Sequence, residues 1–283
     1  MAVLHAQSVT AQIIGISDAK VLDESTPYAQ AQRAFEQKDY ELALRKCRQA
    51  LQDEWPERFE NRILATAARC CLMIHQHEGA IHYVERIHHN NPSSPYISLL
   101  PLVWDHRLPE SERHAPGPGD LTSSSPVRQF AAASAFLLDE EYGNDSHRIL
   151  SEFRASGLLP LTTIAETQLW RLRTNEIDSL PLGTVHNWSE RLSRLPEATR
   201  GGPQFVVGRA LHQHHRVDEA ALHFLWLPMM EHDDSYLAAS SLFEAIQCLE
   251  ETGRRNEARL LRRELLDRFS DSSAARRLRR PGD

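Results

Sequence analysis

Residues 27–56 read PYAQAQRAFEQKDYELALRKCRQALQDEWP, and this stretch decides the fold class. Pro27 follows Thr26, which predicts a helix start, because threonine caps helices and proline is favoured in the first turn. Asp39 offers the same capping chemistry to a second helix, which Pro56 ends. Small residues recur where the two helices would meet, at Ala31, Ala43 and Ala50. Since small side chains let backbones approach closely, the stretch predicts two antiparallel helices packed together.

Three more stretches repeat this arrangement of small residues in an aromatic or aliphatic frame: Ala68…Pro92, Gly208…Phe224 and Gly253…Leu265. Ala43 and Ala80 are 37 residues apart, and Ala220 and Ala258 are 38 apart. In this pattern the chain resembles bacterial tetratricopeptide repeat (TPR) proteins, whose unit has about 34 residues. The resemblance covers residues 24–94 and 201–272. It implies an all-α fold, a TPR-like α-α superhelix in which helical hairpins stack as a solenoid.

The density of helix breakers divides the chain. Proline, glycine and serine punctuate residues 105–126, which predicts a flexible loop and a boundary. The predicted segments are an N-terminal segment without a clear pattern (1–22), N-terminal TPR-like units (23–104), the Pro/Gly/Ser loop (105–126), divergent helical hairpins (127–200), and C-terminal TPR-like units with a capping helix (201–283).

Charge is uneven along the chain. The formal net charge is −7, yet residues 254–283 hold ten arginines against five acidic residues. Such a basic end could contact nucleic acid or an acidic partner. It is also typical of a solvated helix end, because several acids lie within helical reach of arginines. We favour the second interpretation, so nucleic acid is not the expected partner.

The cysteines and the apolar runs bear on the compartment. Cys47, Cys70, Cys71 and Cys248 show no Cys-x-x-Cys spacing, which indicates core thiols in a reducing compartment. No run approaches 18 apolar residues, so no transmembrane segment is expected. Residues 1–12 lack the basic and apolar regions of a signal peptide, which predicts a cytoplasmic protein. A start further upstream that adds a signal peptide would instead place it in the periplasm or envelope.

Candidate chemistry centres on histidine, of which the chain has fifteen. Two clusters stand out: His75, His77, His82, His88 and His89, then His212, His214 and His215. A zinc-protease helix needs histidines four apart, whereas His77 and His82 are five apart and lie on different faces. We therefore predict no catalytic residue, no metal site and no cofactor. Of the five tryptophans, which are predicted to be core, Trp104 precedes the loop and is the candidate for exposure.

The concave face of the predicted superhelix is the candidate binding site. From the resemblance to TPR proteins, the groove and the concave face around it are expected to carry Tyr28, Gln32, Phe35, Arg69, Met73, Phe205 and Arg209. Aromatic and arginine side chains are common interface anchors, although the aromatic ones could equally pack between neighbouring units. The prediction is a non-enzymatic scaffold or adaptor that binds another protein, as a peptide or helix.

Two other functions remain open. One is an accessory subunit of an enzyme or nucleic-acid complex that acts through the Arg-rich C-terminal end. The other is a metal-dependent enzyme that uses the histidine clusters.

Overall fold

The computed structural model of the chain describes residues 25–109, 112, 116–175, 180–230 and 235–279. Over these residues the regular structure is helical, without a strand. The α-helices in chain order are α3 (Pro27–Glu36), α4 (Tyr40–Ala50), α5 (Glu57–Met73), α6 (His77–Asn90), α7 (Pro126–Phe136), α8 (Gly143–Ala155), α9 (Leu161–Asn175), α10 (Leu182–Leu192), α11 (Gly201–Gln213), α12 (Val217–Met229), α13 (Ser235–Glu251), α14 (Arg255–Arg268) and α15 (Ser273–Arg279). Short 3-10 helices are η2 (Pro95–Leu99), η4 (Pro118–Thr122) and η6 (Glu197–Thr199). The all-α prediction is confirmed for the described residues, and the N-terminal segment 1–22 lies outside them.

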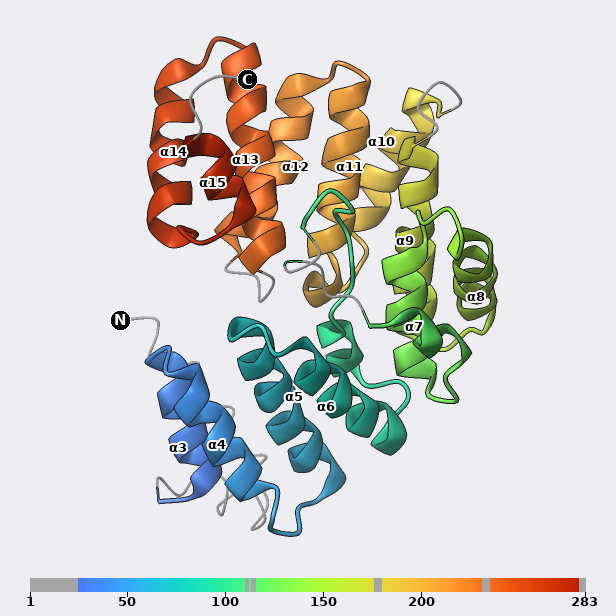
Figure 1. Ribbon diagram of the computed structural model, residues 1–283, viewed down its shortest axis with the longest axis vertical. Coiled ribbons are helices and arrows are strands. Elements are labelled where there is room, and N and C mark those ends of the chain that lie inside the picture. The colour runs from blue at the N-terminus through green and yellow to red at the C-terminus, as the bar shows by residue number, and fades with distance from the viewer. Residues whose placement is uncertain (1–24, 110–111, 113–115, 176–179, 231–234, 280–283) are drawn as a thin grey trace.

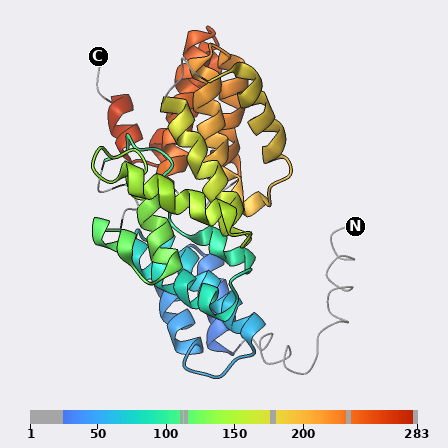
Figure 2. The same ribbon diagram turned by 90° about the vertical axis from the view of Figure 1, so that its right-hand side faces the viewer.

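Successive helices pack side by side, and Figure 1 shows them following a curved path from α3 to α15. Seen from the side, the molecule is elongated, with α3–α6 at one end and α12–α14 at the other (Figure 2). The path curves back toward its start. His75 lies between α5 and α6, and its ring stacks on the ring of Tyr236 in α13 with centroids 4.4 Å apart. The first and last parts of the chain therefore touch.

One turn geometry recurs in four helix pairs. Each turn has a residue in the left-handed region, namely Lys38 (φ 62°), His75 (φ 59°), His215 (φ 59°) and Gly253 (φ 75°). The following N–H donates to a carbonyl five residues earlier in each case: Asp39 to Ala34 at 2.9 Å, Gln76 to Cys71 at 2.8 Å, Arg216 to Leu211 at 2.9 Å and Arg254 to Leu249 at 2.8 Å. This is the bond that closes a Schellman helix end. The pairs α3–α4, α5–α6, α11–α12 and α13–α14, named here the repeated hairpins, thus share one local structure.

Small residues sit where these hairpins close. Ala31, Ala43 and Ala50 are fully buried, as their spacing predicts. Gly208 of α11 shows how tight such a contact is, since a Cβ there would lie 2.9 Å from the ring of Phe224. Close backbone approach is therefore built into the repeated hairpins, and a larger side chain would push the paired helices apart.

The segment between α6 and α7 differs from the predicted flexible loop. Asp105, Glu112 and Leu121 are buried there, and Ser125 caps α7 by accepting from the N–H of Arg128. Glu112 reaches the far end of the chain, where it accepts from the N–H and Oγ of Ser273 at 2.7 and 2.6 Å. Among the described residues between α6 and α7 the regular structure consists of short 3-10 helices such as η2 and η4. The prolines and glycines do not prevent burial of the side chains there.

Candidate functional site

A cavity of about 580 Å³ lies on the inner side of the curved path. Its lining comes from both ends of the chain: α3 and α5 on one side, and η6, α11, α12 and α13 on the other. Residues 95–104 cross between these sides, and α9 contributes Ile164. A volume between about 300 and 1,000 Å³ is usual for ligand sites, so this cavity is large enough to bind a short segment of another molecule.

One wall of the cavity is a single face of α5. Arg62, Ala65, Thr66, Arg69 and Leu72 line it, and their spacing of three or four residues places them on the same side of the helix. The two arginines are exposed, while the small residues between them keep the wall flat. The wall thus combines apolar surface with two positive charges.

Tyr28 of α3 extends this wall. It is 2% exposed, and burial raises the pKa of its hydroxyl, which stays protonated as a hydrogen-bonding group. Gln32 lies beside it, with Nε2 3.5 Å from the hydroxyl oxygen. Farther along, the Arg69 guanidinium lies over the Phe35 ring, 4.9 Å from its centroid. The ring helps to hold Arg69 at the edge of the cavity through a cation–π contact.

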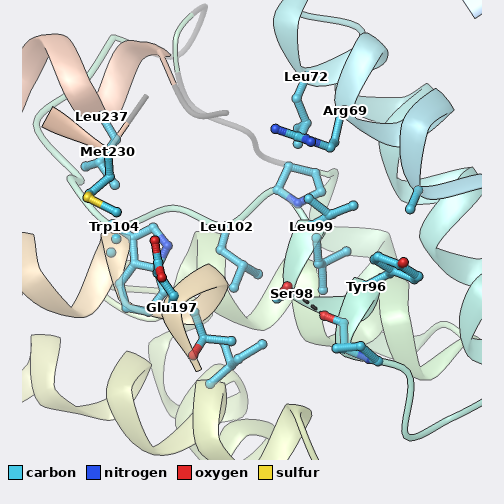
Figure 3. A pocket seen from close by; sticks show the side chains of 18 of the residues that line it. Arg69, Leu72, Tyr96, Ser98, Leu99, Leu102, Trp104, Glu197, Met230 and Leu237 are labelled. Carbon is cyan, nitrogen blue, oxygen red and sulfur yellow. Dashed lines mark hydrogen bonds between the residues drawn. The ribbon is translucent and has the colours of Figure 1, made fainter. Parts of the chain in front are cut away.

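The opposite wall depends on a close contact between Trp104 and Gly202. A Cβ at Gly202 would lie 1.9 Å from the indole ring, so the tryptophan packs directly on the backbone of α11. Trp104, the tryptophan that the sequence singles out for exposure, is half-buried and lines the cavity. Figure 3 shows Glu197 beside Trp104, with Met230 and Leu237 above them and Leu99 and Leu102 between Glu197 and Arg69.

The predicted groove residues are not all at this site. Tyr28 and Arg69 line the cavity, and Gln32 and Phe35 support them, whereas Met73 is half-buried outside it.

Phe205 and Arg209 require a correction. Phe205 is fully buried against Phe224, at a ring separation of 5.7 Å, and Arg209 lies 3.8 Å from the buried carboxylate of Asp105. The reason is that α11 packs against α9, α10 and α12, so only its first residues reach the cavity.

A buried charge cluster lies beside the cavity, and sequence reasoning missed it. Asp105 accepts from Arg107 at 2.9 and 3.2 Å and from Ser240 of α13 at 2.7 Å. Arg107 also pairs with Glu244 of α13 at 2.7 Å. Burial alone would raise the pKa of Asp105, but the bonds from Arg107 and the charge of Arg209 hold it below its usual range. The cluster fixes residues 105–107, next to Trp104, against α13.

Arg171 and His106 lie in the same interior. Arg171 is 2% exposed and donates to the Ser134 carbonyl at 2.7 Å and to Gln168 Oε1 at 2.6 Å. Burial lowers the pKa of His106 to about 4, so its imidazole is neutral at pH 7. No spacing in the sequence signals these contacts, because they join segments that are far apart in the chain.

The histidine clusters and the four cysteines can now be located in the structure. In the part of the chain that the structure describes, no three His, Cys, Asp or Glu side chains are grouped to hold a metal ion. His212 instead faces Glu251 at 3.0 Å. All four cysteines are buried, and burial raises the pKa of Cys71 to about 11. Burial likewise raises the pKa of Cys47 and Cys248, so these three thiols are protonated at pH 7.

The Arg-rich C-terminal end is extensively paired. Arg254 contacts Glu257 at 3.2 Å, Arg262 contacts Glu250 at 2.5 Å, and Arg268 pairs with Glu264. Arg276 pairs with Glu112 at 2.7 Å, and the Arg277 guanidinium covers the Phe243 ring at 4.2 Å. Much of the positive charge is therefore neutralised by the chain itself.

Within the described residues, none of the helices is long and apolar enough to cross a membrane. Comparisons of the chain with protein-family models, with curated proteins and with solved structures found no match.

Proposed function

We propose that the chain is a TPR-like α-α superhelix, a non-enzymatic scaffold that binds a peptide segment of a partner protein in the 580 Å³ cavity. The fold proposal is supported by the four repeated hairpins, whose left-handed turn residues recur 37 residues apart at Lys38 and His75 and 38 apart at His215 and Gly253. Recurring units of this kind stack on their neighbours and form extended inner surfaces, which repeat proteins use for binding.

The cavity itself carries the functional proposal. Its walls come from α5 at one end of the chain and from α12 and α13 at the other, so an occupant touches both. The lining presents Tyr28, Tyr96, Trp104 and Trp226 together with Arg62 and Arg69. Aromatic and arginine side chains supply much of the binding energy at protein interfaces. Because packed helices hold them in place, little ordering is needed when a partner binds.

A pocket-filling substitution tests this proposal. Thr66 is half-buried on the α5 wall, so Thr66→Trp places an indole inside the cavity. Gln49→Trp is the matched control, because Gln49 is exposed on α4 and does not line the cavity. Binding would be measured against an array of short peptides, with circular dichroism to verify that each variant folds.

We expect peptides that bind the wild type and Gln49→Trp to lose about tenfold or more in affinity for Thr66→Trp, a change of about 1.4 kcal/mol. Equal binding by all three proteins would exclude the cavity as the site.

A further inference from the structure

Exposed apolar side chains gather on α12 and α14, the second helices of the last two repeated hairpins. Leu222 and Met229 of α12 are 72% and 75% exposed, and Leu260 of α14 is 64% exposed. Leu222 and Met229 are seven residues apart, so they lie on one face of α12. None of these three side chains, named here the α12–α14 surface, lines the cavity. Large apolar side chains that gather on a surface mark interaction sites, whereas scattered ones do not.

The register of the two hairpins places Leu222 beside Leu260. The buried Ala220 and Ala258 hold the same position in the two hairpins, and each leucine follows its alanine by two residues. Equivalent positions of stacked repeats are neighbours, because each repeat packs on the next.

Contacts between α12 and α14 agree with this register. The half-buried Leu225 of α12 and Leu261 of α14 each pack against both of the apolar cores that meet there. Near the ends of the two helices, the Arg268 guanidinium donates to the Pro228 carbonyl at 3.1 Å. The apolar surface therefore continues from one helix to the other.

The equivalent position is polar in the N-terminal hairpins. Arg45 of α4 and His82 of α6 are exposed there, two residues after the buried Ala43 and Ala80. The repeated hairpin thus forms without an apolar side chain at this position. Packing within the unit therefore does not explain the exposed leucines.

Three arginines flank the leucine of α14. Arg255, Arg259 and Arg263 are exposed at intervals of four residues, and Arg263 lies one turn from Leu260. Within the described part of the chain these three make no ion pair, in contrast to the other arginines of α14. Arg259 donates to the neutral Asn256 at 3.3 Å, which leaves its charge unopposed.

The nearby acids leave the centre of the surface positive. Glu257 and Glu264, one turn to either side of Leu260, are already paired with arginines. The exposed Asp218 precedes the apolar residues of α12 by one turn, and the exposed Asp267 follows the arginines of α14 by one turn. These two carboxylates lie at opposite ends of the surface, so its middle combines leucine side chains with guanidinium groups.

We propose that the α12–α14 surface binds an amphipathic helix of a partner protein, with apolar residues along one stripe and Asp or Glu along the stripe beside it. The apolar stripe covers Leu222, Met229 and Leu260, as an amphipathic helix does when it lays its apolar face on a partner. The acidic stripe pairs with Arg259 and Arg263, with which carboxylates form strong hydrogen bonds. Charge complementarity selects an acidic partner over a basic one. This site is separate from the cavity and takes a different ligand.

The test uses three fluorescently labelled peptides of about 16 residues, long enough to form a helix on binding. The first has a leucine stripe beside a glutamate stripe, the second has lysine in place of glutamate, and the third is a scrambled form of the first. Their affinities would be measured by fluorescence anisotropy, together with that of a labelled DNA duplex.

Two double variants of the protein address the two parts of the surface. Leu222→Ser/Leu260→Ser removes the leucines, and its matched control is Leu158→Ser/Leu159→Ser, at leucines that are 45% and 58% exposed between α8 and α9.

Arg259→Glu/Arg263→Glu reverses the charge. Its control is Arg45→Glu/Arg154→Glu, because these arginines are exposed on α4 and α8. Circular dichroism would verify that every variant folds.

We expect the acidic striped peptide to bind the wild type and both controls about tenfold more tightly than the basic or scrambled peptide. Leu222→Ser/Leu260→Ser should lower this affinity about tenfold, because less apolar area is buried. Arg259→Glu/Arg263→Glu should instead prefer the basic peptide. Thr66→Trp, which fills the cavity, should bind the acidic peptide like the wild type, so failure of the cavity proposal is distinguished from failure here.

Four results would overturn the proposal. They are equal binding of the three peptides to the wild type, losses as large in the controls as in the test variants, tighter binding of the duplex than of the acidic peptide, and a wild-type dimer in sedimentation that Leu222→Ser/Leu260→Ser converts to a monomer. The third result would assign the arginines to nucleic acid, and the fourth would make a second copy of the chain the occupant.

Discussion

The repeated hairpins and the middle of the chain connect their helices in different ways. In the hairpins one turn recurs four times, with a left-handed residue and the same closing hydrogen bond. Between α7 and α8, Asp139 instead accepts from the N–H groups of Glu141 and Tyr142 at 2.9 and 3.0 Å. Between α8 and α9, Gly157 has φ 72° and Leu159–Pro160 is a cis peptide. The middle connections therefore resemble neither each other nor the repeated turn.

The two regions also contribute differently to the lining of the cavity. The repeated hairpins provide its walls through α5, α12 and α13, whereas the middle helices α7–α10 provide Ile164. Trp170 and Trp188 of the middle stack on each other at 4.9 Å, inside the core. The repeated hairpins line the cavity from both sides, and the middle lies between them in the chain.

The largest expected effect comes from breaking the contact between residues 105–107 and the repeated hairpins, at α11 and α13. Asp105→Asn keeps the shape but removes the charge that Arg107 and Arg209 face. Arg107 keeps its pair with Glu244, whereas the largely buried Arg209 loses the carboxylate that it faces. We expect the free energy of unfolding in urea to fall by about 3 kcal/mol, since breaking a buried ion pair is costly. Asp145→Asn, in an exposed pair with Arg148, is the control and should change it by less than about 0.5 kcal/mol. Equal effects of the two substitutions would show that the charge of Asp105 does not stabilise its contact with α11 and α13.

A smaller effect compares packing in the two regions through two helical glycines. In the repeated hairpin α11–α12, Gly208→Ala brings a Cβ to 2.9 Å from Phe224 and should destabilise by about 1–3 kcal/mol, as overpacking does. In the middle, nothing lies within 4 Å of a Cβ at Gly183 of α10, so Gly183→Ala should stabilise by up to about 1 kcal/mol. Thermal unfolding of both variants measures the change in stability that each substitution causes. A change of the same sign at Gly208 and Gly183 would contradict the difference in packing.

The repeated hairpins are the part that local sequence predicts best. Small residues such as Ala43, and caps such as Asp39, act within one helix pair, and both are found where the sequence places them. The cavity is harder to predict, because Trp104 and Gly202 meet only through the path of the whole chain. Phe205 was misplaced for the same reason: its position within one hairpin does not reveal that α9 and α10 cover that helix. Periodicity predicts which residues share a face, but not which distant helix packs on it.

Two half-buried histidines provide a further comparison, because both respond to acid. His223 lies in the repeated hairpin α11–α12, and burial lowers its pKa to about 4, as it does for His106 in the connecting segment. The folded pKa of each histidine lies below the unfolded value of 6.5. The stability that each neutral imidazole contributes to the folded state is therefore complete above pH 6.5 and is lost as the pH falls toward 4. We expect each site to reduce the free energy of unfolding by about 1 kcal/mol at pH 5, after allowance for partial exposure.

His223→Gln isolates one of these sites. The amide can still bond Ser189, which lies 3.1 Å from Nε2, but it does not titrate. The slope of unfolding free energy between pH 7 and pH 5 should therefore become shallower than in the wild type. An unchanged slope would mean that protonation of His223 is not linked to folding.

The smallest expected effect tests whether the recurring turn is one structure. The left-handed region costs about 1 kcal/mol for a residue with a side chain, and glycine avoids this cost. Lys38, which is exposed at φ 62°, should therefore gain stability when replaced by glycine, and Gly253, at φ 75°, should lose a similar amount when replaced by alanine. Opposite shifts in the melting temperature of these two variants would indicate one strained geometry at the first and last repeated turns. Shifts of the same sign would instead show that the N-terminal and C-terminal hairpins are stabilised by different contacts.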